Sequence, residues 1–201
     1  MPEGWQFRAL GDLVHDVRDA VDPDAVAPDT PYVGLEHIPR RSIALAEWGF
    51  AAEVGSTKLR FRRGDILFGK IRPYFHKVGV APVAGVASSD AIVIRPKAKQ
   101  DFGFALAVVS SDAFVAHATQ TSNGTKMPRA NWGVLREYRV PMPPRALHAR
   151  FEEFMASVVS AVANHVHRNR NLRTTRDLLL PKLISGELDV SALPEPETTA
   201  A

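Results

Sequence analysis

The sequence contains no cysteine among its 201 residues. This absence excludes disulfide bonds and thiolate metal sites, and it fits a reducing cytosol. No apolar run is long enough to span a bilayer, and the first residues, Met1 to Gly4, lack the charged-then-apolar pattern of a signal peptide. Together these absences predict a cytoplasmic protein without a membrane-spanning segment.

The motifs that mark common enzyme classes are also missing. The sequence has no Gly-x-Gly-x-x-Gly or Gly-Lys-Ser/Thr phosphate loop and no Gly-x-Ser-x-Gly elbow. The one Pro-Pro pair, Pro143-Pro144, is preceded by Met142, so it does not form the catalytic element of a nucleic-acid methyltransferase. His165 and His167 are two residues apart on an expected helix, point to different faces and cannot share a metal. The sequence therefore predicts a non-catalytic chain, and we assign no cofactor and no metal ligand.

The charge is unevenly distributed along the chain. The net charge is only +3, but residues 54–79 carry seven basic side chains and one acid, whereas residues 1–30 carry seven acids and two bases. A basic centre between acidic ends focuses positive potential on one region of the surface. The alternative is an ordinary solvated face. The apolar fraction of 45% indicates a folded protein, long enough for one domain with an appendage.

The segment from Phe61 to Lys77 is the most informative part of this basic centre. A turn at Gly64-Asp65 leads into a short apolar strand, and cations then alternate with aromatic rings. Such a strand and loop would present its cations rigidly to a polyanion, which favours nucleic acid as the ligand. For Arg72 the alternative is an ion pair that braces the loop, and for Phe75 packing in the core is favoured.

The spacing of apolar residues predicts an α+β fold with a β-rich first part. We expect a weak helix at 5–17, strands at 32–35, 59–61, 66–68, 78–83, 91–94 and 137–142, and one or two helices over 102–117 with a capping break at Ser110-Ser111-Asp112. A polar loop over 119–131 has its turn at Asn123-Gly124. The three prolines at 141, 143 and 144 end this domain.

The chain then changes character, because residues 145–180 contain neither glycine nor proline. Residues with 4-3-4-3 spacing form a heptad seam: Phe151, Met155, Val158, Val162, His165, Asn169, Leu172, Arg176 and Leu179. The seam predicts a coiled coil with a partner helix, and the alternative is a long helix packed on its own domain. We expect Pro181 to interrupt the helix and Gly186 to stop it. The predicted division is 1–143 for the first domain, 144–186 for the helix and 187–201 for a flexible acidic tail.

Several blocks in this order resemble the specificity subunit of type I restriction-modification systems. The blocks are Tyr32–Ile38, Gly64–Tyr74, Ser88–Ile94, Gly124–Arg129 and Leu178–Leu188, and the resemblance extends from about Gly4 to Val190. Their order and spacing carry the match. The chain departs from the family where Arg145-Ala146-Leu147-His148 follows the prolines, a place where members commonly carry Glu-Gln.

The resemblance implies a target-recognition domain followed by a conserved spacer helix. Members usually contain two of each, so this chain resembles half a subunit, and the implied assembly is a homodimer through the C-terminal helix. The implied partners are double-stranded DNA with a bipartite site, a methyltransferase subunit that carries the chemistry and possibly a restriction subunit. The implied dimer contacts are Phe151, Met155, Val158, Val162, His165, Asn169, Leu172 and Leu179.

The residues expected to face DNA come from the two loops of the first domain. They are Lys70, Arg72, Tyr74, Lys77, Ser122, Asn123, Gly124, Thr125, Lys126 and Arg129. Arginine and lysine neutralise phosphates or bind guanine, and asparagine pairs with adenine. Two other functions remain open at this point, a stand-alone dimeric DNA-binding regulator and a coiled-coil interaction module.

Overall fold

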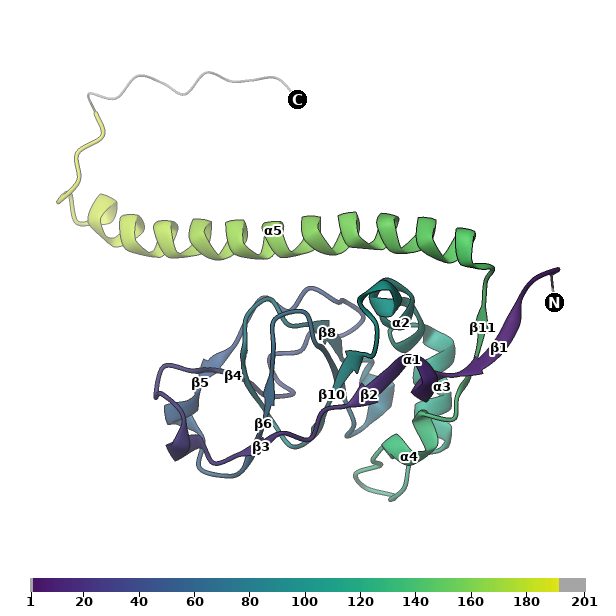
Figure 1. Cartoon of the computed structure of the whole chain (residues 1–201). Coiled ribbons are helices and arrows are strands. Elements are labelled where there is room, and N and C mark those ends of the chain that lie inside the picture. Colours follow the sequence, from purple (N-terminus) through teal and green to yellow (C-terminus); the bar gives the residue numbers. More distant parts are fainter. Residues whose placement is uncertain (1, 192–201) are drawn as a thin grey trace.

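The computed structural model describes residues 2–191 and contains a β-rich domain and one long helix, α5 (Arg145–Ile184). The helix runs along one side of the domain, and the ribbon of β1 and β11 connects the two (Figure 1). This arrangement confirms the predicted α+β class with a long C-terminal helix. The predicted tail, 187–201, lies outside the described residues from position 192 onward.

Two larger sheets and one two-stranded ribbon make up the β structure. The four-stranded sheet is antiparallel and has the order β2 (Val14–Asp16), β10 (Ala91–Pro96), β7 (Ile66–Gly69) and β8 (Val78–Val80). The five-stranded sheet has the order β3 (Ala20–Val21), β6 (Lys58–Phe61), β9 (Gly85–Ala87), β4 (Pro31–Val33) and β5 (Gly49–Phe50). Within it β4 and β9 are parallel. The ribbon pairs β1 (Gln6–Ala9) with β11 (Arg139–Met142).

The central strand β7 is buried on both faces, which explains its unbroken apolar sequence. Ile66 and Phe68 pack in a cluster with the helices α2 (Phe102–Val109) and α3 (Asp112–Gln120). Leu67 points the other way, into a second cluster with Val33 and Phe61. A strand covered on both sides needs apolar residues at every position rather than in alternation.

The break predicted between the two helices is confirmed at Ser111. Its hydroxyl oxygen accepts a hydrogen bond from the backbone N–H of Phe114 at 3.1 Å and so caps α3. Among the described residues, no single helix is long and apolar enough to cross a membrane. The helical segments 99–109 and 112–120 are long and apolar enough for a membrane span only when they are counted together, and a bend of 67° separates them.

The helix expected at 5–17 is wrong apart from one turn, α1 (Leu10–Leu13). The residues before it form β1, which pairs with β11 more than 130 positions later, and those after it form β2 beside β10. The apolar spacing nevertheless identified core residues, because Leu10, Leu13 and Val14 are fully buried. Long-range strand pairing here outweighs a weak local preference for helix.

Helix α5 passes through Pro181, so the predicted interruption there is wrong. Pro181 lies within four residues of the helix end, and its missing N–H removes one intrahelical hydrogen bond near a terminus. The predicted stop at Gly186 is confirmed by its left-handed backbone, with φ of 74°. The helix is thus continuous from Arg145 to Ile184.

Candidate nucleic-acid interface

The basic-aromatic loop leaves the sheet at Gly69 and has a fixed backbone. Arg72 and His76 both adopt left-handed conformations, with φ of 49° and 52°, on either side of one helical turn, Pro73–Phe75. For residues other than glycine this conformation costs about 1–2 kcal/mol each, so the surrounding contacts must hold it. Hydrogen bonds from Phe75 N to Arg72 O (2.9 Å) and from His76 N to Pro73 O (2.8 Å) close the turn.

The two loops predicted to face DNA are joined to each other by backbone hydrogen bonds. Arg72 N donates to Pro128 O and Ala130 N donates to Lys70 O, both at 2.8 Å. The polar loop is itself closed where Asn123 and Arg129 exchange two hydrogen bonds of 3.0 and 2.8 Å. Segments nearly sixty positions apart in the sequence therefore form one surface.

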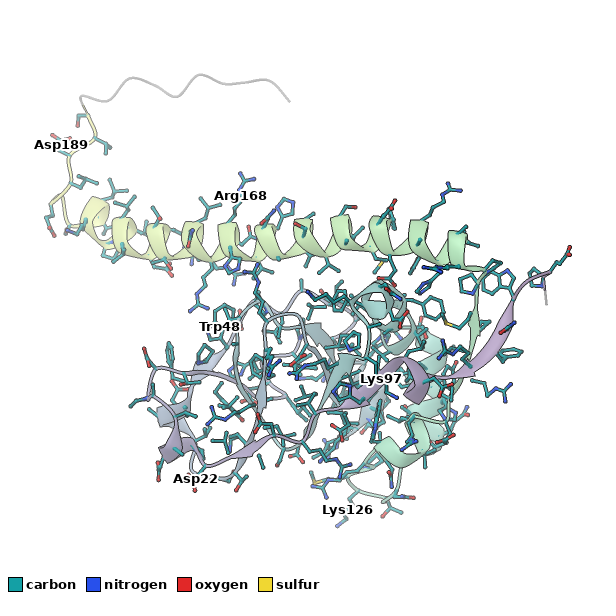
Figure 2. All side chains as sticks on the ribbon, in the orientation of Figure 1. Asp22, Trp48, Lys97, Lys126, Arg168 and Asp189 are labelled. Carbon is teal, nitrogen blue, oxygen red and sulfur yellow. The ribbon has the colours of Figure 1, made fainter. Side chains whose placement is uncertain are left out.

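Most of the predicted residues on the polar loop face outward. Asn123, Gly124, Thr125, Lys126 and Arg129 are all exposed. Figure 2 shows Lys126 at the edge of the domain that lies away from α5. This surface thus lies on the far side of the domain from the long helix.

Ser122 and Lys77 turn toward their own chain instead. The Ser122 hydroxyl donates to Thr119 O at 2.7 Å. The Lys77 ammonium donates to the carbonyl of Leu35, and its pKa is lowered by burial and by the nearby Arg40. The geometry gives both side chains a role in holding the loops.

The aromatic pair of the first loop has one exposed and one packed ring. Tyr74 is half exposed, whereas the Phe75 ring lies beneath the Arg40 guanidinium, 4.1 Å from its carbon. Arg72 is half buried and reaches Lys126 O with a long contact of 3.4 Å. The Arg72 guanidinium thus contacts a backbone carbonyl of the other loop rather than a carboxylate, so this contact is not the ion pair that the sequence offered as the alternative.

A groove of about 480 Å³ runs between these loops and the connection from β2 to β3. Its polar lining combines cationic groups and side-chain amides with one carboxylate and one hydroxyl: Arg18, Lys70, Arg129, Asn123, Asn131, Asp16 and Ser89. Sequence reasoning missed Arg18 and Asn131, as well as the indole of Trp132 beside them. Arg18 lies in the acid-rich first thirty residues, and only the fold brings it to the basic centre. Cations with amides suit the phosphates and base edges of nucleic acid.

The predicted dimer seam divides into two halves. Phe151, Met155, Val158 and Val162 are half buried, whereas His165, Asn169, Leu172 and Leu179 are exposed. In the first half the Phe151 ring packs edge-on against Phe104, with 6.3 Å between centroids, and Met155 packs against the core cluster. The alternative of packing on its own domain thus describes the first half of the seam.

The second half of α5 has few contacts with the domain. Its last contacts are Arg170, stacked 3.9 Å over the ring of Trp48, and Arg173, which is 3.4 Å from Glu47. From Leu172 onward, large apolar side chains are exposed: Leu172, Leu178, Leu179, Leu180, Leu183 and Ile184. Leu172 is 65% exposed and Ile184 is 79% exposed. We name these six residues the leucine-rich end of α5; exposed large apolar side chains gathered in one segment are typical of an interaction site.

Comparison with known proteins gives a consistent result, although no protein-family model matches the chain. The chain is 28% identical over 197 residues to the type I restriction enzyme EcoDI specificity subunit of Escherichia coli, covering 94% of this chain and 43% of that protein. It is 20% identical over 207 residues to the type I restriction enzyme MjaIX specificity subunit of Methanocaldococcus jannaschii, covering 96% and 46%. The chain thus spans about half the length of the curated relatives it matches.

Solved structures share the fold. The HsdS subunit from Thermoanaerobacter tengcongensis superimposes with a TM-score of 0.62 at 21% identity, over 98% of this chain and 53% of that one. The S subunit of a type I restriction-modification system from M. genitalium gives a TM-score of 0.58 at 12% identity, over 90% and 46%. The resemblance to type I specificity subunits predicted from the sequence is confirmed.

Proposed function

We propose that this relative of type I restriction specificity subunits recognises DNA for a type I restriction-modification complex and carries no chemistry of its own. The observation that supports this most strongly is the union of the two loops, 70–77 and 122–130, by backbone hydrogen bonds. Lys70 and Arg129 line one groove, and the exposed Lys126 lies on the same pair of joined loops. A rigid surface with cations and amides fits duplex DNA, because contacts to phosphates position the protein and contacts to base edges read the sequence.

In this proposal the exposed cations of the polar loop, Lys126 and Arg129, contact the DNA phosphates. Replacing either with alanine is expected to weaken binding to target and random DNA by the same factor. The slope of log affinity against log salt should fall by about one for each lost phosphate contact. Fluorescence anisotropy with labelled duplexes at several salt concentrations measures both quantities.

Arg168 provides the matched control for this experiment. It is exposed on α5, and its side chain points away from the domain (Figure 2). The Arg168→Ala variant loses the same charge and should bind DNA like the unaltered chain. If Lys126→Ala and Arg129→Ala also bind target and random DNA like the unaltered chain, the loops are wrongly assigned.

The proposed role of α5 is assembly, through its leucine-rich end. We place a second copy of this chain against it, in a twofold arrangement that would present two recognition domains to a bipartite site. The polar seam residues His165 and Asn169 would fix the register of the helix pair. The same helices would dock the methyltransferase subunit, which supplies catalysis, and, where the system includes one, a restriction subunit.

Replacing Leu172 and Leu179 with lysine is expected to convert the dimer into a monomer. Each lysine would place a charge in an apolar helix contact, which is strongly unfavourable without a partner. Size-exclusion chromatography with light scattering measures the mass. Asn171→Lys is the control, because Asn171 is also exposed but lies outside the seam. A strict monomer for the unaltered chain, alone and with its methyltransferase, would rule out the proposed dimer.

A further inference from the structure

Arg18 occupies a backbone position that is fixed from both sides. Its neighbour Val17 donates from N to Val93 O at 2.7 Å, which attaches it to the four-stranded sheet. Its other neighbour, Asp19, accepts at its carbonyl from Arg60 N at 2.7 Å, which attaches it to the five-stranded sheet. The Arg18 backbone thus bridges the two sheets, and its side chain lines the groove described above.

The Arg18 side chain is also oriented, by a carboxylate behind it. Its Nε donates to Asp16 Oδ2 at 2.7 Å. Asp16 is only 9% exposed at its side chain, whereas Arg18 is 74% exposed. A solvent-exposed ion pair would contribute little, but here an almost buried carboxylate holds the inner edge of an exposed guanidinium. Within residues 2–191, no carboxylate other than Asp16 pairs with Arg18, so its two terminal NH₂ groups are available to a ligand.

The surroundings of the groove indicate which ligand atoms this fork would meet. Lys70 and the amides of Asn123 and Asn131 line the same groove, and Arg129 lies at its exposed edge. Two parallel N–H donors in a fixed plane match the O6 and N7 acceptors of guanine in the major groove. A phosphate contact needs charge but no fixed plane, and the exposed Lys126 and Arg129 already supply such charge on the polar loop.

We propose that Arg18 is a specificity-determining residue that reads a guanine in the DNA target, with Asp16 as the residue that positions it. This inference rests on the proposed function and names one base contact within it. Neither residue belongs to the basic segments of the sequence, and both reach the interface only through the fold.

The test selects a preferred sequence from a randomised duplex library with the full chain, alone and with its methyltransferase subunit. Binding is then titrated with that sequence and with duplexes in which each guanine is replaced. For Arg18→Lys, which keeps the charge, affinity for the preferred duplex should fall by about 10- to 100-fold, and the preference for guanine should disappear at one position. Affinity for random duplex should be unchanged. Asp16→Asn should cause a smaller loss at the same position.

Several outcomes would overturn this assignment. If Arg18→Lys and Arg18→Ala both retain the preference for guanine, Arg18 does not read a base. The proposed function would still stand. An Arg18→Ala variant that binds all duplexes equally more weakly, with a reduced salt slope, makes Arg18 a phosphate contact. If the unaltered chain selects no DNA sequence, either alone or with its methyltransferase subunit, the proposed function fails together with this inference. Arg168→Ala is the charge control, and circular dichroism verifies that each variant is folded.

Discussion

The Asp65→Ala variant is expected to lose about 3–5 kcal/mol of its free energy of unfolding. The Asp65 carboxylate is 4% exposed and accepts two hydrogen bonds from Arg95, from Nε and Nη2, each at 2.7 Å. It also accepts the backbone N–H of Arg62 at 2.7 Å, which closes the turn before β7. The hydrogen bonds that Arg95 donates to Asp65 raise the pKa of Arg95, so the arginine stays charged and would be left partly buried without a partner. A loss of this size is a large fraction of a typical domain's stability.

Urea denaturation followed by tryptophan fluorescence measures this loss. Glu137→Ala is the control, because its ion pair with Arg136 at 3.1 Å is exposed on both sides, and its loss should stay below about 1 kcal/mol. The double variant Asp65→Ala with Arg95→Met should regain part of the stability, since it removes the stranded charge. Equal midpoints for Asp65→Ala and Glu137→Ala would show that the buried pair does not stabilise the fold.

The Glu152→Ala variant is expected to loosen α5 from the domain and to cost about 2–3 kcal/mol. Glu152 lies on α5, and its two carboxylate oxygens accept the backbone N–H groups of Gly103 and Phe104 at 2.8 and 2.7 Å. These N–H groups belong to the first turn of α2, where no intrahelical acceptor is available and the helix dipole favours an anion. One side chain of the long helix thus caps a helix of the domain.

Thermal unfolding measures the stability of this variant, and small-angle X-ray scattering measures its shape, which should become more extended. Glu153→Ala is a close control, because Glu153 is the next residue on the same helix and is exposed. Gly103→Ala should act like Glu152→Ala, since a Cβ at that position would come within 2.4 Å of the Met155 Cβ. Unchanged scattering and melting for both Glu152→Ala and Gly103→Ala would mean that this contact does not dock the helix.

The sequence predicted the elements whose cause is local. The apolar run at Ile66–Phe68, the cap at Ser111 and the stop at Gly186 each follow from neighbouring residues, and each appears in the structure. The N-terminal strands could not be predicted in this way. Strand β1 is fixed by pairing with β11, which lies beside it in space but at the other end of the domain's sequence. Pro181 failed as a breaker because it lies near the helix end.

The sequence predicted which residue types form the candidate interface, but it predicted the roles of only some of these residues. The basic-aromatic loop and the polar loop, both expected to face DNA, are joined by backbone hydrogen bonds into one surface. However, Lys77 looked like a surface cation, and its position beside the Leu35 carbonyl depends on a contact between residues 42 positions apart. Arg18 was counted in an acidic segment, and only the crossing from one sheet to the other carries it into the groove. Roles of this kind depend on long-range contacts, which local sequence does not encode.

The central claim is that this chain recognises a DNA sequence through the surface made by its two joined loops. The most direct test measures the affinity of the chain, together with the methyltransferase subunit proposed as its partner, for two duplexes at the same salt concentration. One duplex is selected from a randomised library, and the other is a random duplex. The claim predicts that the selected duplex binds at least about 10³-fold more tightly, and that Lys126→Ala with Arg129→Ala weakens both. Equal affinity for the two duplexes, or no binding to either, would contradict it.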